Sequence, residues 1–312
     1  MEFEKVKSVF QKVYSEVGQV IVGQDKVLEQ ILIAMLTNQN ALLESNPGLG
    51  KTTMIKTIAE VLDLKFSRIQ FTPDLMPADV TGTQIVEEVS GKRYFKFQQG
   101  PIFANIVLAD EINRATPKTQ SAMLEAMQEK QVTVGNKSYP LDEPFFVLAT
   151  QNPIEQEGTY PLPEAQTDRF LLKIFVDFPD EEAELGILER FTSSKSPNKP
   201  KVIIPKASLL KLQQYTREVP ISNDLKKKVV QIVQKTRSFE GIEFGASPRA
   251  SIGLVMAAKA RALMDGRSSV KKEDVQAMAA PVLRHRIILN FDAERKGTSA
   301  DELIAKIVDK IL

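Results

Sequence analysis

The chain of 312 residues contains no cysteine and only one histidine. The absence of cysteine excludes a disulfide framework and thiolate metal sites, and one histidine builds no metal site by itself. This composition fits a reducing compartment. An excess of charge of one sign is also lacking, because 41 basic residues nearly balance 40 acidic ones. No global basic field favours nucleic acid, although the balance leaves room for a local basic patch.

A long apolar run is the other missing feature. No stretch is long enough to cross a bilayer, and residues 1–5 lead into an amphipathic helix instead of the apolar core of a secretion signal. We therefore expect a cytoplasmic protein without membrane insertion. The length and the 43% content of hydrophobic residues suffice for two domains.

A glycine-rich stretch at 44–53, Glu-Ser-Asn-Pro-Gly-Leu-Gly-Lys-Thr-Thr, is the strongest signal in the sequence. It lies between the apolar run 41–43 and the segment 54–62, whose apolar residues have helical spacing. A strand that ends in such a turn and continues as a helix directs several backbone N–H groups, and the positive end of the helix dipole, at one point. That point suits a phosphate. We expect nucleotide contacts from Asn46, Pro47, Gly48, Leu49, Gly50, Lys51, Thr52 and Thr53.

The residue types in this stretch predict separate tasks. Lys51 would reach the β- and γ-phosphates of a nucleotide, and the Thr52 hydroxyl would bind the Mg²⁺ that bridges them. The pattern G-x-x-x-x-G-K-[ST] has its first glycine where this chain has Ser45. A backbone angle that only glycine tolerates would strain Ser45. The alternative is a turn with a chance lysine, which the flanking strand and helix disfavour.

Two adjacent acids end the continuous apolar run at 106–109. A run that is apolar on both faces is typical of a central parallel strand. Strand ends carry the chemistry of a doubly wound sheet, so we expect Asp110 and Glu111 beside the phosphates. Asp110 would hold Mg²⁺, directly or through water, and Glu111 would orient and help deprotonate the attacking water. The alternative, a plain strand terminus at the surface, is disfavoured by the upstream phosphate loop.

Two weaker candidates lie near these motifs. The buried strand expected at 145–150 is followed by Asn152, whose amide suits contact with the γ-phosphate or the attacking water. An Asn-Pro pair is otherwise an ordinary turn. Gly23 and Gln24 end a short apolar turn that begins at Val20, just upstream of the phosphate loop. The spacing fits an adenine-binding element and a plain helix–helix turn equally well.

Arg169 precedes the last strand expected in the sheet, at 171–176. We expect it to lie far from Lys51 across the sheet and to point outward, so that it acts on a neighbouring subunit. The alternative role is a salt bridge with Asp168 or another local acid.

Two β-prone segments surround tight turns, at 84–97 and at 131–139. A nucleotide-binding sheet is complete without them, so we expect two hairpins that project as contact elements. Extra edge strands of the sheet are the alternative.

The region after 178–180 is expected to contain no strands. A helix to about Phe191, a polar linker at 192–200 and four or five helical segments predict a separate all-helical domain, with boundaries at 1–191 and 192–312. Ser247 is expected to cap one of these helices, with Pro248 in its first turn. Arg249 is then a cation near a helix start, an unfavourable place unless an anion is nearby, which points to phosphate contact. We expect His285 to be a surface or interface residue.

Together these features resemble an AAA+ ATPase, and more narrowly a member of the MoxR family. The resemblance runs from about Val20 to the end of the chain. It implies an α/β fold, namely an AAA+ P-loop core with a central parallel sheet flanked by helices, two β-hairpin insertions and a C-terminal all-helical lid domain. The stretches that carry it are 108–115 (Leu-Ala-Asp-Glu-Ile-Asn-Arg-Ala), 120–127, 149–153 (Ala-Thr-Gln-Asn-Pro), 158–166 (Gly-Thr-Tyr-Pro-Leu-Pro-Glu-Ala-Gln) and 245–250 (Gly-Ala-Ser-Pro-Arg-Ala).

The resemblance also implies roles. Asp110 corresponds to the Walker B acid, Asn152 to sensor 1, Arg169 to the arginine finger and Arg249 to sensor 2 of an enzyme that binds ATP and Mg²⁺ and hydrolyses ATP. The hairpins correspond to the helix-2 insert and the pre-sensor-1 hairpin of the clade that includes magnesium chelatase and minichromosome-maintenance helicases.

The family implies a ring, commonly a hexamer, that acts as a chaperone-like remodeller or in metal-cofactor insertion with partners carrying von Willebrand factor A domains. A nucleic-acid motor is a second possibility, because Lys92, Arg93, Lys96 and Lys137 place charge on the hairpins. A nucleotide switch that barely hydrolyses is a third, and Glu111 argues against it. We favour a protein client, since no nucleic-acid module is appended.

Overall fold

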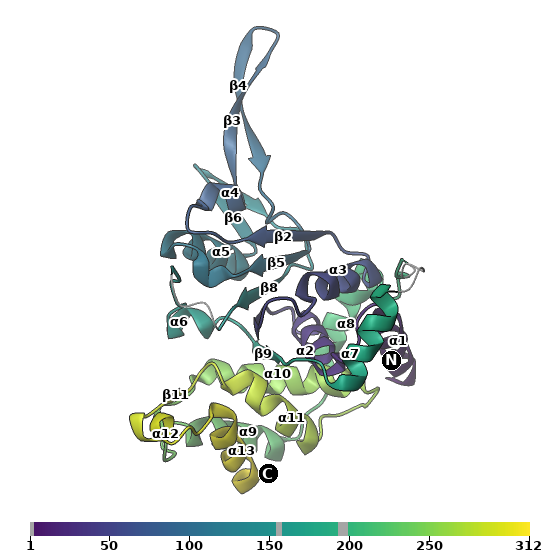
Figure 1. Cartoon of the computed structure of the whole chain (residues 1–312), viewed down its shortest axis with the longest axis vertical. Coiled ribbons are helices and arrows are strands. Elements are labelled where there is room, and N and C mark those ends of the chain that lie inside the picture. The colour runs from purple at the N-terminus through teal and green to yellow at the C-terminus, as the bar shows by residue number, and fades with distance from the viewer. Residues whose placement is uncertain (1–2, 154–157, 193–198) are drawn as a thin grey trace.

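A five-stranded parallel sheet forms the centre of the molecule (Figure 1). The computed structural model describes residues 3–153, 158–192 and 199–312. The strands lie in the order β2-β5-β8-β1-β9, and each neighbouring pair is parallel. The strand bounds are β1 Ala41–Ser45, β2 Phe66–Gln70, β5 Ile106–Asp110, β8 Phe146–Gln151 and β9 Leu172–Val176.

The burial of the strands explains why the sequence predicts them well. Every residue of β5 is buried, as is every residue of β8 except the last. Alternate side chains of β5 join different hydrophobic clusters, with Ile106 and Leu108 in one and Val107 and Ala109 in the other. Successive side chains point to opposite faces of a strand, so the sheet is covered on both sides. The predicted central parallel sheet flanked by helices is confirmed.

Helix α1 buries one apolar stripe. In α1 the buried residues are Val6, Phe10, Val13 and Val17, spaced three or four apart as on one helix face. The helix bounds are α1 Phe3–Val17, α2 Asp25–Leu36, α3 Lys51–Val61, α4 Pro77–Thr81, the 3₁₀ turn η1 Ile112–Arg114, α5 Pro117–Glu129, α6 Glu164–Thr167 and α7 Glu181–Thr192.

Two β-hairpins stand apart from the central sheet. The first pairs β3 (Gly82–Val89) with β4 (Lys92–Gln99), and the second pairs β6 (Gln131–Val134) with β7 (Lys137–Pro140). Each forms its own two-stranded sheet, so the alternative of extra edge strands is wrong. The first hairpin projects from the end of the molecule opposite the C-terminal helices (Figure 1). The Phe97 ring stacks on the Tyr139 ring with 4.0 Å between centroids, which joins the two hairpins at their base.

The described residues after Lys199 form six helices and one short antiparallel strand pair. The expectation of a helical C-terminal part is confirmed, but two details were wrong. The helices number more than four or five, and strands β10 (Ile242–Phe244) and β11 (Ile288–Leu289) follow the point where strands were expected to cease. The helix bounds are α8 Lys206–Glu218, α9 Asn223–Lys235, α10 Pro248–Met264, α11 Lys272–Leu283, α12 Phe291–Arg295 and α13 Ala300–Ile311.

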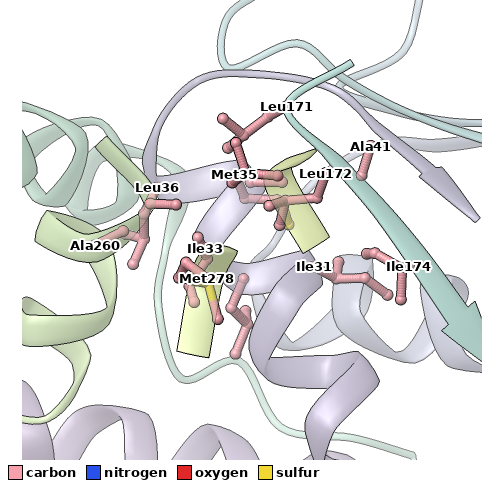
Figure 2. Close-up of a cluster of buried hydrophobic side chains, with 14 of the residues drawn as sticks. Ile31, Ile33, Met35, Leu36, Ala41, Leu171, Leu172, Ile174, Ala260 and Met278 are labelled. Carbon is pink, nitrogen blue, oxygen red and sulfur yellow. The ribbon is translucent and has the colours of Figure 1, made fainter. Parts of the chain in front are cut away.

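Helix α2 links the sheet to the C-terminal helices. Figure 2 shows side chains of α2 between β9 on one side and α10 and α11 on the other. Ile31 lies toward Ile174 of β9, and Ile33 lies near Met278 of α11. One hydrophobic cluster therefore contains residues from α1 to α13. The domain boundary at 191/192 stays a prediction, since α7 ends at Thr192 and most of the expected linker lies outside the described residues.

The Phe97–Tyr139 stack predicts how the first hairpin is anchored. An aromatic pair contributes ~0.5–1.5 kcal/mol beyond its buried area, so Phe97→Ala should raise the opening of the hairpin about 2- to 12-fold. Limited trypsin cleavage after Lys92, Arg93 or Lys96 would measure this opening. Phe95→Ala is the matched control, because Phe95 lies on the same strand with 78% of its surface exposed. Equal cleavage rates in both variants would contradict the anchoring role.

Candidate functional site

The glycine-rich stretch forms the predicted strand, loop and helix. Strand β1 ends at Ser45, and α3 begins at Lys51 with Gly50 as its N-cap. Gly48 and Gly50 have φ of +84° and +72°, the left-handed region that favours glycine. The Lys51 ammonium lies over the loop, since Nζ is 3.4 Å from the carbonyl oxygens of both Ser45 and Asn46. A glycine-rich loop at the start of a helix, with the Lys51 ammonium beside it, suits an anion.

Ser45 does not carry the backbone strain that the sequence pattern raised. It is the last residue of β1, pairs in register with Val176, and has no positive φ. Its side chain is buried, and Oγ donates to the carbonyl oxygen of Asn46 at 2.8 Å. A serine therefore fits here because an extended backbone does not need glycine.

A pocket of about 420 Å³ adjoins the loop. The turn at 20–24 forms one wall, the loop and the start of α3 form another, and α7 with the segment before it closes the third. Gln24 Nε2 donates to the Leu49 carbonyl at 3.2 Å, while its buried Oε1 has no hydrogen-bond partner among the described residues. The lining residues are Val20, Ile21, Val22, Gln24, Gly48, Leu49, Gly50, Thr53, Phe178, Pro179, Glu184, Ile187 and Phe191.

Gly23 makes the close packing behind this pocket possible. Its φ is +71°, and a Cβ built on it would lie 2.6 Å from the Cβ of Ala183 in α7. The turn can therefore approach α7 only without a side chain at this position. A mostly apolar pocket beside a phosphate-type loop, with one buried acceptor, fits a nucleobase. Between the two alternatives for this turn, the geometry favours the adenine-binding element over a plain helix connection.

Asp110 ends β5 with both carboxylate oxygens engaged. Oδ1 accepts from the Thr150 hydroxyl at 2.7 Å, and Oδ2 accepts from Nε and Nη2 of Arg68 at 3.0 and 2.7 Å. Asp110 is 6% exposed, so these donors hold it in one orientation. Since its oxygens already have donors, the arrangement favours contact with Mg²⁺ through water over direct ligation.

Glu111 has an unusual backbone and a fixed carboxylate. Its φ of +57° is left-handed, and its backbone N–H donates to the Thr150 hydroxyl at 2.8 Å. Oε2 accepts from Gln70 Nε2 at 2.8 Å and from Arg114 Nη1 at 3.2 Å. A strained residue with an oriented acid is typical of a functional position.

Asn152 follows β8 directly and is 6% exposed. Strand β8 lies between β5 and β1, so Asn152 shares the carboxyl edge of the sheet with the phosphate-type loop and the two acids. Among the described residues, no group of three or more His, Cys, Asp or Glu side chains could hold a metal ion. A metal at this edge would need phosphate oxygens and water besides Thr52 and Asp110, which fits Mg²⁺.

Arg169 lies at the opposite edge of the sheet, and the expected reason for its distance from Lys51 was wrong. Strand β9 is the direct neighbour of β1, so Arg169 is not across the sheet from the loop. Leu171 N–H instead donates to the carbonyl of Asn40, at the amino end of β1. The five residues of β1 then separate Arg169 from the loop by about 17 Å along the strand.

Arg249 also lies at this amino edge. Nη1 pairs with Asp168 Oδ2 at 3.2 Å, so a protein carboxylate lies beside this cation, and the phosphate contact expected of Arg249 stays a prediction. Ser247 is the N-cap residue by position, with Pro248 following it as expected, but its side chain makes no capping bond. Its hydroxyl donates to Asp168 Oδ2 at 3.2 Å instead. In the described part of the chain Asp168 pairs with Arg249 and Arg286 and not with Arg169, so the Asp168 salt bridge proposed as the alternative role of Arg169 is absent.

His285 is an interface residue, as predicted. Its Nε2 lies 3.0 Å from the carbonyl oxygen of Phe170, so it joins the segment after α11 to the start of β9. Burial lowers the pKa of His285 well below its usual range, and the Arg286 guanidinium adds to this effect. Sequence analysis missed Arg68, Gln70, Thr150 and Arg286. Only Arg68 and Gln70 carry a signal, because residues two apart in β2 share one face.

Two family models match the chain in order. The model described as "ATPase family associated with various cellular activities (AAA)" matches residues 40–172, and the model described as "AAA lid domain" matches residues 234–307. A crystal structure of a protein from Cytophaga hutchinsonii superposes with a TM-score of 0.92 at 44% identity, covering 100% of this chain and 96% of that one.

Curated relatives agree with these models. The chain is 45% identical to "Chaperone MoxR1" of Mycobacterium tuberculosis, covering 95% of this chain and 80% of the relative. It is 42% identical to an uncharacterized protein of Bacillus subtilis, covering 99% and 96%. It is 31% identical to "Protein MoxR" of Paracoccus denitrificans, covering 90% and 89%. With such relatives along nearly its whole length and both family models in sequence order, this chain belongs to the MoxR family of AAA+ ATPases.

Proposed function

We propose that the protein binds ATP with Mg²⁺, hydrolyses ATP to ADP and phosphate, and uses the energy for chaperone-like remodelling of a protein partner. The observation that carries the proposal is the convergence at one sheet edge of the phosphate-type loop after β1, the acids at the end of β5 and Asn152 after β8. The pocket walled by Gln24 and α7 adds a place for the base.

Each residue at this edge has a stated task in the proposal. The loop 46–50 donates backbone N–H groups to the phosphates, and Lys51 brings the charge. Thr52, and Asp110 through water, would hold Mg²⁺, which would supply positive charge against the phosphates. Glu111 orients the attacking water and accepts its proton, and Asn152 hydrogen-bonds to the γ-phosphate or to that water.

Arg169 and Arg249 are proposed to act on the nucleotide of a neighbouring subunit. Both lie at the amino edge of the sheet, about one strand length from their own loop. Arg249 is 54% exposed, and no ion pair engages Arg169 in the described residues. A ring, commonly a hexamer in this family, would bring this edge to the next subunit's pocket.

The two hairpins are proposed to contact the client, which in this family includes proteins with von Willebrand factor A domains. The exposed hydrophobic residues Val86, Tyr94 and Phe95 on the first hairpin suit a polypeptide. Metal-cofactor insertion through such a partner is the second form of the same proposal. A nucleic-acid motor is less well supported, because Lys96 and Arg93 pair with Glu87 and Glu88 at 3.1 and 3.6 Å.

Gln24 tests the base pocket. The buried Oε1 of Gln24 would accept from the amino group of adenine, whereas guanine presents a carbonyl there. Gln24→Ala should weaken ATP binding about tenfold and reduce the preference for ATP over GTP. Calorimetry with both nucleotides measures this. Gln19→Ala is the control, because Glu16 is the one hydrogen-bond partner of the exposed Gln19 side chain in the part of the chain that the structure describes. Unchanged selectivity would remove Gln24 from base recognition.

Glu111 tests the hydrolytic role. Glu111→Gln should keep ATP binding and lower hydrolysis ~10²- to 10⁴-fold, because the amide keeps the shape of the side chain and loses the proton acceptor. Phosphate release with and without single-stranded DNA or a von Willebrand factor A protein gives the rate and separates the client classes. Glu125→Gln, an exposed acid on α5, should leave the rate unchanged. Turnover near wild type in Glu111→Gln would require another base.

Arg169 tests the role in trans. Arg169→Ala should bind ATP and lose hydrolysis by ~10³- to 10⁵-fold, as for arginine fingers in general. Lys51→Ala should lose ATP binding, since no side-chain charge then meets the phosphates. A mixture of these inactive variants should recover partial activity, because one supplies an intact loop and the other an intact arginine. Subunit exchange, followed by energy transfer between labels, without recovered activity would rule out a role in trans.

A further inference from the structure

Asp168 accepts hydrogen bonds from three side chains of the C-terminal part of the chain. The Ser247 hydroxyl and Arg249 Nη1 donate to Oδ2, each at 3.2 Å, and Arg286 Nε donates to Oδ1 at 2.8 Å. Ser247 and Arg249 belong to the start of α10, whereas Arg286 follows α11. Asp168 precedes Arg169 directly, so one carboxylate connects both candidate arginines.

Arg286 holds the backbone on both sides of Arg169. Its Nη2 donates to the carbonyl oxygens of Asp168 and Phe170, and its Nη1 donates to that of Leu171 at 3.0 Å. The side chain of Arg286 is only 2% exposed. Burial lowers the pKa of this guanidinium, and the hydrogen bond that it donates to Asp168 opposes that shift. A buried guanidinium whose donors are used in this way fixes the chain from Asp168 to Leu171.

Asp168, Ser247, Arg249 and Arg286 form a hydrogen-bonded cluster that is buried at Arg286 and exposed at Arg249. The exposed fraction of the side chain rises from 2% in Arg286 to 22% in Asp168 and 54% in Arg249. An exposed single-contact ion pair is weak, so Arg249 can leave Asp168 for a phosphate, whereas the Asp168–Arg286 pair stays in place.

We propose that the Asp168–Arg286 pair positions Arg169 and Arg249 together toward the nucleotide of the neighbouring subunit. The inference rests on the proposed role of the two arginines in trans. Asp168 and Arg286 do not touch the nucleotide themselves; they act through the backbone around Arg169 and through the Arg249 side chain. A defect in the pair should therefore affect the arginine side of a subunit contact and leave the loop side intact.

The test uses the mixing of inactive full-length variants. The Lys51→Ala variant supplies an intact Arg169 and is called the arginine donor, and the Arg169→Ala variant supplies an intact loop and is called the loop donor. The ATPase activity recovered by mixing these two variants is the reference recovery. Adding Asp168→Asn to the arginine donor should lower recovery about tenfold or more, since misplacement by about 1 Å can cost ~10²-fold in rate. Adding Asp168→Asn to the loop donor should leave recovery within about twofold of the reference. The loop donors' ATP affinity and the thermal midpoints of all variants establish that they fold.

Asp301→Asn in the arginine donor is the matched control. Asp301 pairs with Arg284 at 2.6 Å, and Arg284 Nη1 also donates to the Lys173 carbonyl in β9. Among the described residues, Asp301 forms no ion pair or hydrogen bond with Arg249. It should keep the reference recovery. Asp168→Glu, which retains the charge beside Arg286 and shifts the carboxylate, is the second variant, and it should show the same one-sided loss if Asp168→Asn does not fold.

The possible outcomes are distinct. Full recovery with the Asp168 variants as arginine donors would overturn the positioning role and leave the role of Arg169 in trans intact. Equal losses in both donors, or an equal loss with Asp301→Asn, would show a general structural role and would also overturn it. No recovery in the reference mixture would overturn the role in trans itself, and this inference with it.

Discussion

The parallel pairing of β1 with both β8 and β9 is the constraint on which the candidate site depends. Parallel strands place all carboxyl ends at one edge of a sheet and all amino ends at the other. The anion-binding loop, the acids and Asn152 therefore gather at one edge, and the segment around Arg169 is held at the other through the bond from Leu171 to Asn40. Within one subunit the two edges are therefore about one strand length apart.

Much of this arrangement follows from local sequence. Strands β5 and β8 are continuous apolar runs because both faces are covered, and the glycines of the loop mark a turn that needs positive φ. The order of the strands is not local information. Strand β9 pairs with β1, which lies far from it in the sequence, and this non-local pairing is why the expected position of Arg169 across the sheet was wrong.

Contacts between residues far apart in the chain could not be predicted from the sequence either. Asp168 and Arg286 are 118 positions apart, and neither belongs to a recognisable spacing. Ser247 shows the related problem of competing partners, because its sequence context predicts a helix cap while the nearby carboxylate takes its hydroxyl. The sequence left the role of the turn at Gln24 open, and only the pocket around its buried Oε1 favours contact with a base.

The aromatic stack between the hairpins has a mechanical consequence. Tyr139 lies on β7, and β8 is the next strand in the chain. Strand β8 ends next to Asn152 at the carboxyl edge of the sheet. Phe97 lies near the base of a hairpin whose strands have eight residues each, about 26 Å in length. The five residues of β4 between the turn and Phe97 span about 16 Å, so a rotation of about 10° at the stack would move the hairpin tip by about 3 Å. A small rotation at the base of the hairpin therefore becomes a larger displacement at its tip.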